Sequence, residues 1–305
     1  MSATVAHARP TVVPAEDAVS AENTVLTAAA FGDRPGASPL PAATDPHRRW
    51  LRAVALGGQG FYSGARAELT RLQREVTEGP LASLAASTEA SLLRQLGWHR
   101  QAAAHDGRAF ALARAAVPRL PEETNRIVEA QCDALTGLAA DALGCGRLGL
   151  SRRLLAQCAD LLGAAGADPA AGDDTAEKGT DFWRQRIRLH WVTAETALAS
   201  GDFATAKQHS AQASARADLS PSVRHRVKSD LLRAASATGD PDLGPARVLV
   251  TDVSERCAEH GLVPLRWAAA MLAHGIGAVP GADHVRDECA QVVTCRGGRF
   301  ATIRN

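Results

Sequence analysis

Apolar residues recur at three- and four-residue spacing along most of the chain, and glycine-containing breaks interrupt this pattern at intervals. Ile127, Ala130, Ala134 and Leu138, for example, would share one face of a helix. Such spacing predicts amphipathic α-helices. Glycine suits the breaks because a helix often ends in a left-handed residue. The breaks fall at Gly60, Gly97, Gly146, Gly201, Gly239 and Gly277.

The pattern predicts twelve helices arranged in six consecutive pairs. The paired ranges are 46–57 with 61–77, 81–96 with 98–116, 122–143 with 147–162, 180–200 with 203–218, 221–238 with 243–260, and 263–276 with 281–295. Asp45 and Pro46 suit the N-cap and the first helical position of the first helix. Few β-branched runs occur, so we expect an all-α fold.

The clearest pair is the stretch from Arg186 to Ala217. Gly201 lies at its turn, Phe203 opens its second helix, and small residues such as Ala206 fall where the two helices would touch. Alanine is suitable there because a larger side chain would hold the helices further apart.

This stretch resembles the helical hairpin of tetratricopeptide-repeat (TPR) proteins, in which a turn glycine, an aromatic residue and crossing alanines hold the same places. The resemblance implies a right-handed TPR-like α-solenoid of about six hairpins with a concave groove. The richness of the chain in Ala, Gly and Arg is typical of a high-GC bacterial genome, as in actinobacteria.

The distribution of Pro, Gly and charge predicts five regions. Residues 1–44 are rich in Pro and Ala and carry no sustained apolar stripe, so we expect a disordered tail that folding does not need. Hairpins one to three occupy 45–162, a flexible Gly/Asp-rich loop 163–179, and hairpins four to six 180–296. We expect the basic tail at 297–305 to be frayed.

The formal net charge is +1, so no global field favours nucleic acid or a membrane surface. The start of the chain lacks the pattern of a signal peptide, and no apolar run is long enough to span a membrane. The six cysteines form no CxxC motif. Together these features indicate a cytoplasmic protein with reduced thiols.

Three of the five tryptophans share one register. Trp50, Trp191 and Trp267 each lie ten residues before a turn glycine. Two interpretations stay open, because these rings could pack between neighbouring hairpins or could line the groove and contact a partner.

Arginines follow the same helices. Arg184, Arg188 and Trp191 share one helix face, and Arg226 and Arg233 lie at similar places on the first helix of pair five. Facing the groove, they would bind carboxylates or phosphates. The alternative is an ordinary solvated face.

Catalytic and metal signatures are absent from the sequence. No nucleotide-binding loop, hydrolase elbow or metalloprotease motif occurs, and the spacing of His274, His284, Cys289 and Cys295 matches no zinc pattern. We therefore predict no catalytic residue, no metal and no cofactor.

The fold resemblance favours a non-enzymatic scaffold or regulatory protein that binds a protein or peptide, acidic in character, in its groove, through Arg184, Arg188, Trp191, Arg226, Arg233, Trp50 and Trp267. The alternative is a sensory helical domain that binds a small ligand or signalling peptide and controls a transcription regulator in trans. A helical lyase or terpene cyclase is disfavoured because paired Asp-rich motifs are missing.

Overall fold

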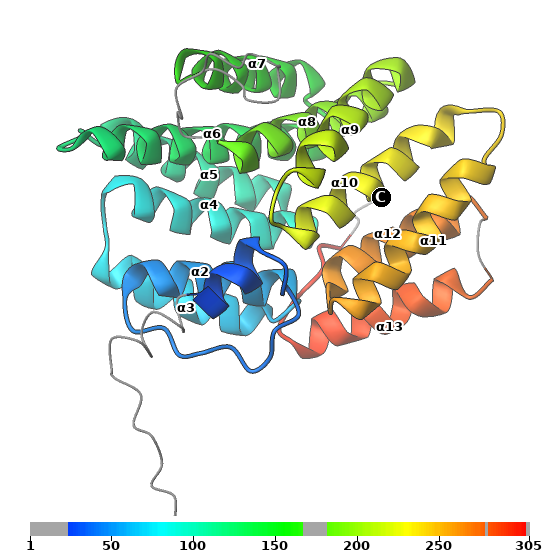
Figure 1. The fold of residues 1–305 in the computed structure, drawn as a ribbon, viewed down its shortest axis with the longest axis horizontal. Helices are drawn as coiled ribbons and strands as arrows, with labels where there is room; N and C mark the ends of the chain where they lie inside the picture. Colours follow the sequence, from blue (N-terminus) through cyan, green and yellow to red (C-terminus); the bar gives the residue numbers. More distant parts are fainter. Residues whose placement is uncertain (1–23, 167–181, 278–279, 303–305) are drawn as a thin grey trace, which may run out of the picture.

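The computed structural model describes residues 24–166, 182–277 and 280–302. These residues form helices and connecting turns and contain no β-strand, which confirms the all-α prediction (Figure 1). Residues 1–23 of the predicted tail, and most of the predicted loop at 163–179, lie outside the described residues.

The helices follow one another in adjacent antiparallel pairs. The pairs are α2 (Pro46–Gly58) with α3 (Tyr62–Glu75), α4 (Gly79–Gln95) with α5 (His99–Ala115), α6 (Pro121–Gly144) with α7 (Leu148–Ala164), α8 (Trp183–Ala199) with α9 (Phe203–Asp218), α10 (Val223–Ser236) with α11 (Gly244–Glu259), and α12 (Val263–Gly275) with α13 (Ala282–Cys295). Each helix overlaps the range predicted for it.

Five of the six predicted turn glycines have positive φ angles, between 56° and 86°, as a left-handed helix end requires. Gly239 differs, because it closes a short 3-10 helix, η2 (Ala237–Gly239), with a different backbone conformation. A Cβ at Gly239 would lie 2.3 Å from the ring of Phe203. Glycine is therefore needed at this turn because a side chain would clash with the Phe203 ring.

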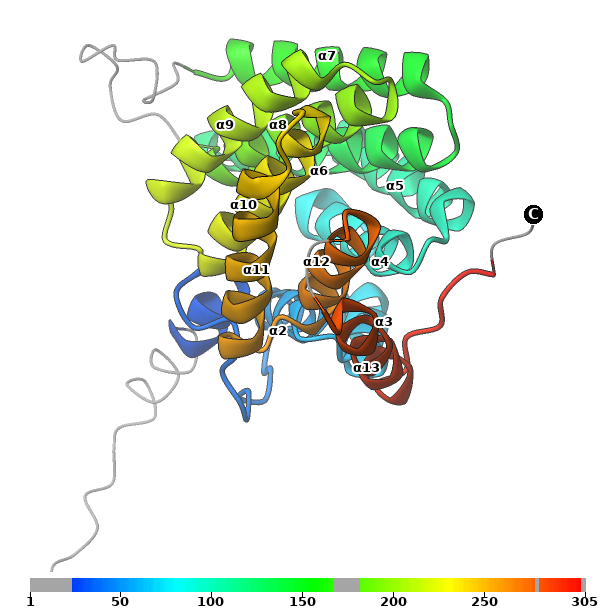
Figure 2. The same cartoon turned by 90° about the vertical axis from the view of Figure 1, so that its right-hand side faces the viewer.

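The helices form an inner and an outer layer (Figures 1 and 2). The first helix of each pair packs against the first helix of the next pair, in the order α2, α4, α6, α8, α10 and α12. Helix α12 in turn contacts α2. The inner helices therefore form a closed cycle of contacts, and the second helix of each pair packs outside its own partner.

The N-terminal segment, residues 24–44, is part of this packed structure. Residues 24–31 are helical, and Leu26 is completely buried. The backbone N–H of Val223 on α10 donates to the carbonyl oxygen of Gly32 (3.1 Å). The Gln59 side chain, just after α2, donates to the carbonyl oxygen of Pro35 (2.8 Å). The prediction of a dispensable tail is thus wrong for residues 24–44, which join α2 to α10.

The C-terminal segment, residues 297–302, is also held in place. The indole N–H of Trp98 donates to the carbonyl oxygen of Arg299, and the backbone N–H of Ala301 donates to that of Leu96, both at 2.7 Å. The ring of Phe300 lies 4.9 Å from that of Trp267. The prediction of a frayed tail is wrong for these residues, because aromatic contacts and hydrogen bonds to the backbone fix them.

The burial of Leu26 gives a direct test of the N-terminal segment. Replacement of a fully buried leucine by alanine removes apolar contacts and leaves a cavity. We expect Leu26→Ala to lower the free energy of unfolding by about 2–5 kcal/mol in chemical denaturation. Leu219→Ala is the control, because Leu219 is 80% exposed and its truncation should have little effect. Equal midpoints for the two variants would contradict the packed segment.

The crossing of α8 and α9 can be tested with a matched pair on α9. Ala206 is completely buried, as the sequence predicts, whereas Ala204 two residues earlier is exposed. Ala206→Leu should destabilise the protein by roughly 1–3 kcal/mol through overpacking. Ala204→Leu introduces the same side chain at a solvated position and should leave the denaturation midpoint nearly unchanged. A similar midpoint shift in both variants would exclude Ala206 from the crossing.

Candidate functional site: an internal cavity

The inner helices surround a cavity of about 670 Å³ that is partly open to solvent. All six inner helices contribute to its wall, together with Phe31 from the N-terminal segment and Phe300 from the C-terminal segment. Small-molecule sites are typically cavities of roughly 300–1,000 Å³ lined by apolar groups and a few polar ones. The cavity is therefore of a size that holds a small molecule.

The three tryptophans that share a register all line this cavity. Two of them also bind the next inner helix. The indole N–H of Trp50 donates to the Thr88 hydroxyl (3.0 Å), and that of Trp191 donates to the Ser229 hydroxyl (2.8 Å). Each bond spans 38 residues. Trp50 and Trp191 therefore pack between neighbouring pairs, and all three rings line the cavity. Their contact with a partner stays a prediction.

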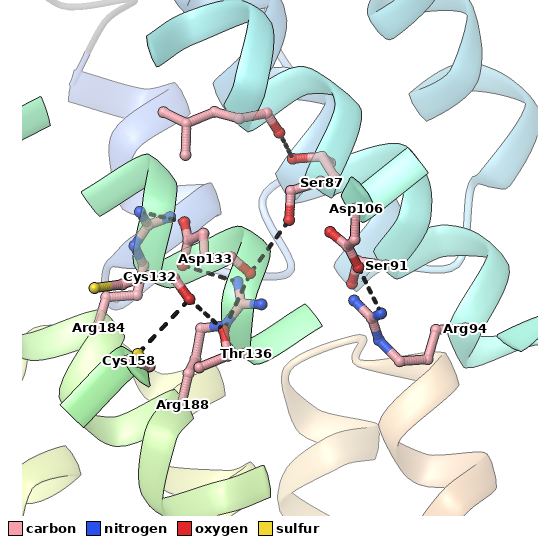
Figure 3. A network of polar contacts seen from close by, with 12 residues as sticks. Ser87, Ser91, Arg94, Asp106, Cys132, Asp133, Thr136, Cys158, Arg184 and Arg188 are labelled. Carbon is pink, nitrogen blue, oxygen red and sulfur yellow. Dashed lines mark hydrogen bonds and ion pairs between the residues drawn. The ribbon is translucent and has the colours of Figure 1, made fainter. Parts of the chain in front are cut away.

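Two of the predicted arginines, on α8, converge on one carboxylate of α6 (Figure 3). Arg184 donates to Asp133 Oδ2 at 2.9 Å, and Arg188 lies 3.2 Å from Asp133 Oδ1. The Arg184 guanidinium also lies over the rings of Phe31 and Trp50, at 4.7 and 5.4 Å. Asp133 was not singled out from the sequence, because nothing in its own surroundings distinguishes it from other helical aspartates.

The two predicted arginines on α10 do not line the cavity. Arg226 donates to the carbonyl oxygen of Ser220, and Arg233 pairs with Asp230 with its side chain 47% exposed. Their placement in the groove is therefore wrong. Residues two positions apart on a helix lie on nearly opposite faces, and the inward face of α10 passes through Arg224 and Lys228.

Arg224 is the cavity cation that the sequence reasoning missed. Its guanidinium donates to the carbonyl oxygens of Val54 (3.1 Å) and Ala30 (3.0 Å). Glycine at position 58 leaves room for this guanidinium, because a Cβ there would lie 2.7 Å from Nη1 of Arg224. Burial, and then the charges of nearby arginines, lower the pKa of Arg224 to about 10, so it remains a cation at neutral pH.

His225 follows Arg224 on α10, and its side chain is buried among aromatic rings, with 3% of the residue exposed. Its imidazole stacks on Trp191, with centroids 5.0 Å apart, and meets the edge of Trp183. Nδ1 lies 2.8 Å from the Ser222 hydroxyl. Burial, followed by the charges of Arg224 and the arginines on α8, holds the pKa of His225 well below its usual value. The imidazole is therefore neutral at physiological pH.

Arg94, which also lines the cavity, forms a second charged cluster with carboxylates of neighbouring helices (Figure 3). It donates to Asp106 at 2.8 Å, to Asp141 at 2.7 Å and to the carbonyl oxygen of Gly137 at 2.9 Å. A Cβ at Gly137 would lie 2.2 Å from the Asp106 carboxylate, so glycine is required for this approach. Burial raises the pKa of Asp106 to about 7, and Arg94 opposes that rise. The cluster therefore links the inner helices α4 and α6 to the outer helix α5.

In the part of the chain that the structure describes, no three His, Cys, Asp or Glu side chains come close enough to hold a metal ion. All six cysteines are free thiols. No helix in the same ranges has both the length and the apolar character needed to cross a membrane.

Neither a protein-family model, nor a curated protein, nor a solved structure matches this chain. The function must therefore be argued from the cavity itself.

The neutral state of His225 generates a pH prediction. In the unfolded chain this histidine takes up a proton near its usual pKa of about 6.5, whereas in the folded protein it does so only at lower pH. Its contribution to stability is thus complete above that value and falls as the pH is lowered. Urea denaturation should show wild type losing stability relative to His225→Gln between pH 7 and about 5. A difference between the two proteins that stays constant with pH would contradict the buried neutral imidazole.

Proposed function

We propose that this chain is a non-enzymatic binding protein that takes a small ligand into its internal cavity. The observation that supports this function is the cavity of about 670 Å³ with a wall built from all six inner helices. A ligand held there would contact every helix pair. Its binding would therefore be coupled to the conformation of the whole protein, as a sensor requires.

This proposal favours the sensory interpretation over a groove for a folded partner. A ten-residue helix is about 15 Å long and about 10 Å across, and so fills more than roughly 1,000 Å³. Such an element would not fit wholly inside the cavity. A small ligand or the end of a signalling peptide would fit. We propose that the loaded protein acts in the bacterial cytoplasm by controlling a transcription regulator in trans.

We also propose that the six pairs are TPR-like repeats closed into a ring. Three features support this relationship: the positive-φ turn glycines, the buried crossing alanines Ala194, Ala206 and Ala213, and the tryptophan bonds that each span 38 residues.

Binding in the cavity can be tested with N-phenylnaphthylamine, a neutral apolar dye that fluoresces when it leaves water. We expect saturable binding to the wild-type protein. Ala268→Phe fills part of the cavity. It should lower the affinity for the dye by about tenfold or more, because the added ring occupies the space that the dye needs. Ala204→Phe adds the same ring on the exposed face of α9 and should bind as wild type does.

Circular dichroism of both variants would establish that they fold. Absence of saturable binding, or equal weakening in the two variants, would contradict a ligand site in the cavity.

A further inference from the structure

The charges that face the cavity are unbalanced along α8 and α10. Arg184, Arg188 and Arg224 all line it, and one lining carboxylate, Asp133, is paired with two of them. The bonds of Arg224 go to two neutral carbonyl oxygens, and no carboxylate among the described residues is paired with it. This arginine cluster (Arg184, Arg188 and Arg224) therefore carries three positive charges against one negative charge.

The other cations in the wall are compensated. Arg94 lies between two buried carboxylates, and Lys228 lies 2.7 Å from Glu195. Glu129 also acts on Arg184, although burial raises the pKa of Glu129 and disfavours its charged form. Even with Glu129 counted as an anion, the arginine cluster keeps an excess positive charge.

Arg184 is buried, and Arg188 and Arg224 are partly buried. An excess charge that is withdrawn from water is costly unless an opposite charge compensates it. The protein already limits this cost, because burial and neighbouring arginines keep His225 neutral. Within the described ranges, it does not supply a further carboxylate to Arg224. An anion between Arg188 and Arg224 would restore the balance. Guanidinium groups bind carboxylate and phosphate oxygens in paired hydrogen bonds.

The wall from α12 to the C-terminus has the opposite character. Its lining residues are all apolar: Leu262, Pro264, Leu265, Trp267, Ala268, Val293 and Phe300. The indole of Trp191, which stacks on His225, also lines the cavity. The cavity is thus amphipathic, with cations on α8 and α10 and an apolar surface on α12 and the C-terminal segment.

We propose that the cavity ligand is an amphipathic organic anion, with carboxylate or phosphate oxygens bound by Arg188 and Arg224 and a flat apolar body against Trp191 and Trp267. This inference rests on the proposed function, since it names the chemical class of the ligand that the cavity takes. A neutral apolar ligand would fill the same space but leave the arginine cluster uncompensated.

The test compares two dyes with the same phenylnaphthylamine skeleton. Anilinonaphthalene sulfonate carries an anionic group, and N-phenylnaphthylamine does not. We expect the sulfonate dye to bind wild type at least about tenfold more tightly than the neutral dye. Arg188→Gln and Arg224→Gln should each remove most of that preference and leave the affinity for the neutral dye unchanged.

Two variants are needed because Arg224 also holds the N-terminal segment, whereas Arg188→Gln leaves that contact in place. Arg233→Gln is the matched control, since Arg233 lies outside the cavity. It should retain the full preference for the sulfonate dye. Loss of the preference in Arg233→Gln would indicate a general charge effect and would overturn the assignment.

The outcomes separate the two proposals. Failure of the neutral dye to bind, or its binding outside the cavity, contradicts the proposed function itself. Cavity binding of the neutral dye with no preference for the sulfonate dye leaves the function standing and overturns the anionic ligand. Displacement of the sulfonate dye by naphthoate or by naphthyl phosphate then distinguishes a carboxylate ligand from a phosphate ester. Displacement by neither compound would contradict the proposed ligand class.

Discussion

The structure depends on one constraint, the closure of the inner helices on themselves. A helix pair cannot bury its own apolar face, so each pair needs a neighbour on both sides. Here the last inner helix contacts the first, and the segments 24–44 and 297–302 pack against the inner helices. Residues 24–44 join α2 to α10, and residues 297–302 bind the end of α4. Closure turns the inward face of the array into the wall of a cavity.

The helices and turns were predictable because their signals are local. Apolar spacing, turn glycines and crossing alanines each act within a few residues, and the observed helices overlap the predicted ranges. Closure was not predictable in this way. Residues 24–44 contain three prolines and no sustained apolar stripe, yet Leu26 is completely buried in a core cluster with residues of α2, α3 and α4. The place of Phe300 likewise depends on a residue distant in the sequence, because its ring packs against that of Trp267 on α12.

The candidate site was predictable in part for a related reason. Arg184, Arg188 and the three tryptophans were found because a helix face and a shared register relate them. On α10 a register error of two residues selected Arg226 in place of Arg224, and so exchanged an outward position for an inward one. Asp133 and Gly58 could not be found at all, since their roles depend on side chains that approach from other helices.

Closure and the proposed recognition of an anion meet at Arg224. Its guanidinium holds carbonyl oxygens of α2 and of the N-terminal segment while it also lines the cavity. A planar guanidinium has five N–H donors in fixed directions, so it can keep two carbonyl bonds and still direct donors elsewhere. A lysine ammonium is a strongly hydrated point charge and would lose more on burial at this place. The absent Cβ of Gly58 provides the space that this flat group needs. Arg224 thus joins α10 to α2 and to the N-terminal segment, and it also leaves a positive charge that the proposed ligand compensates.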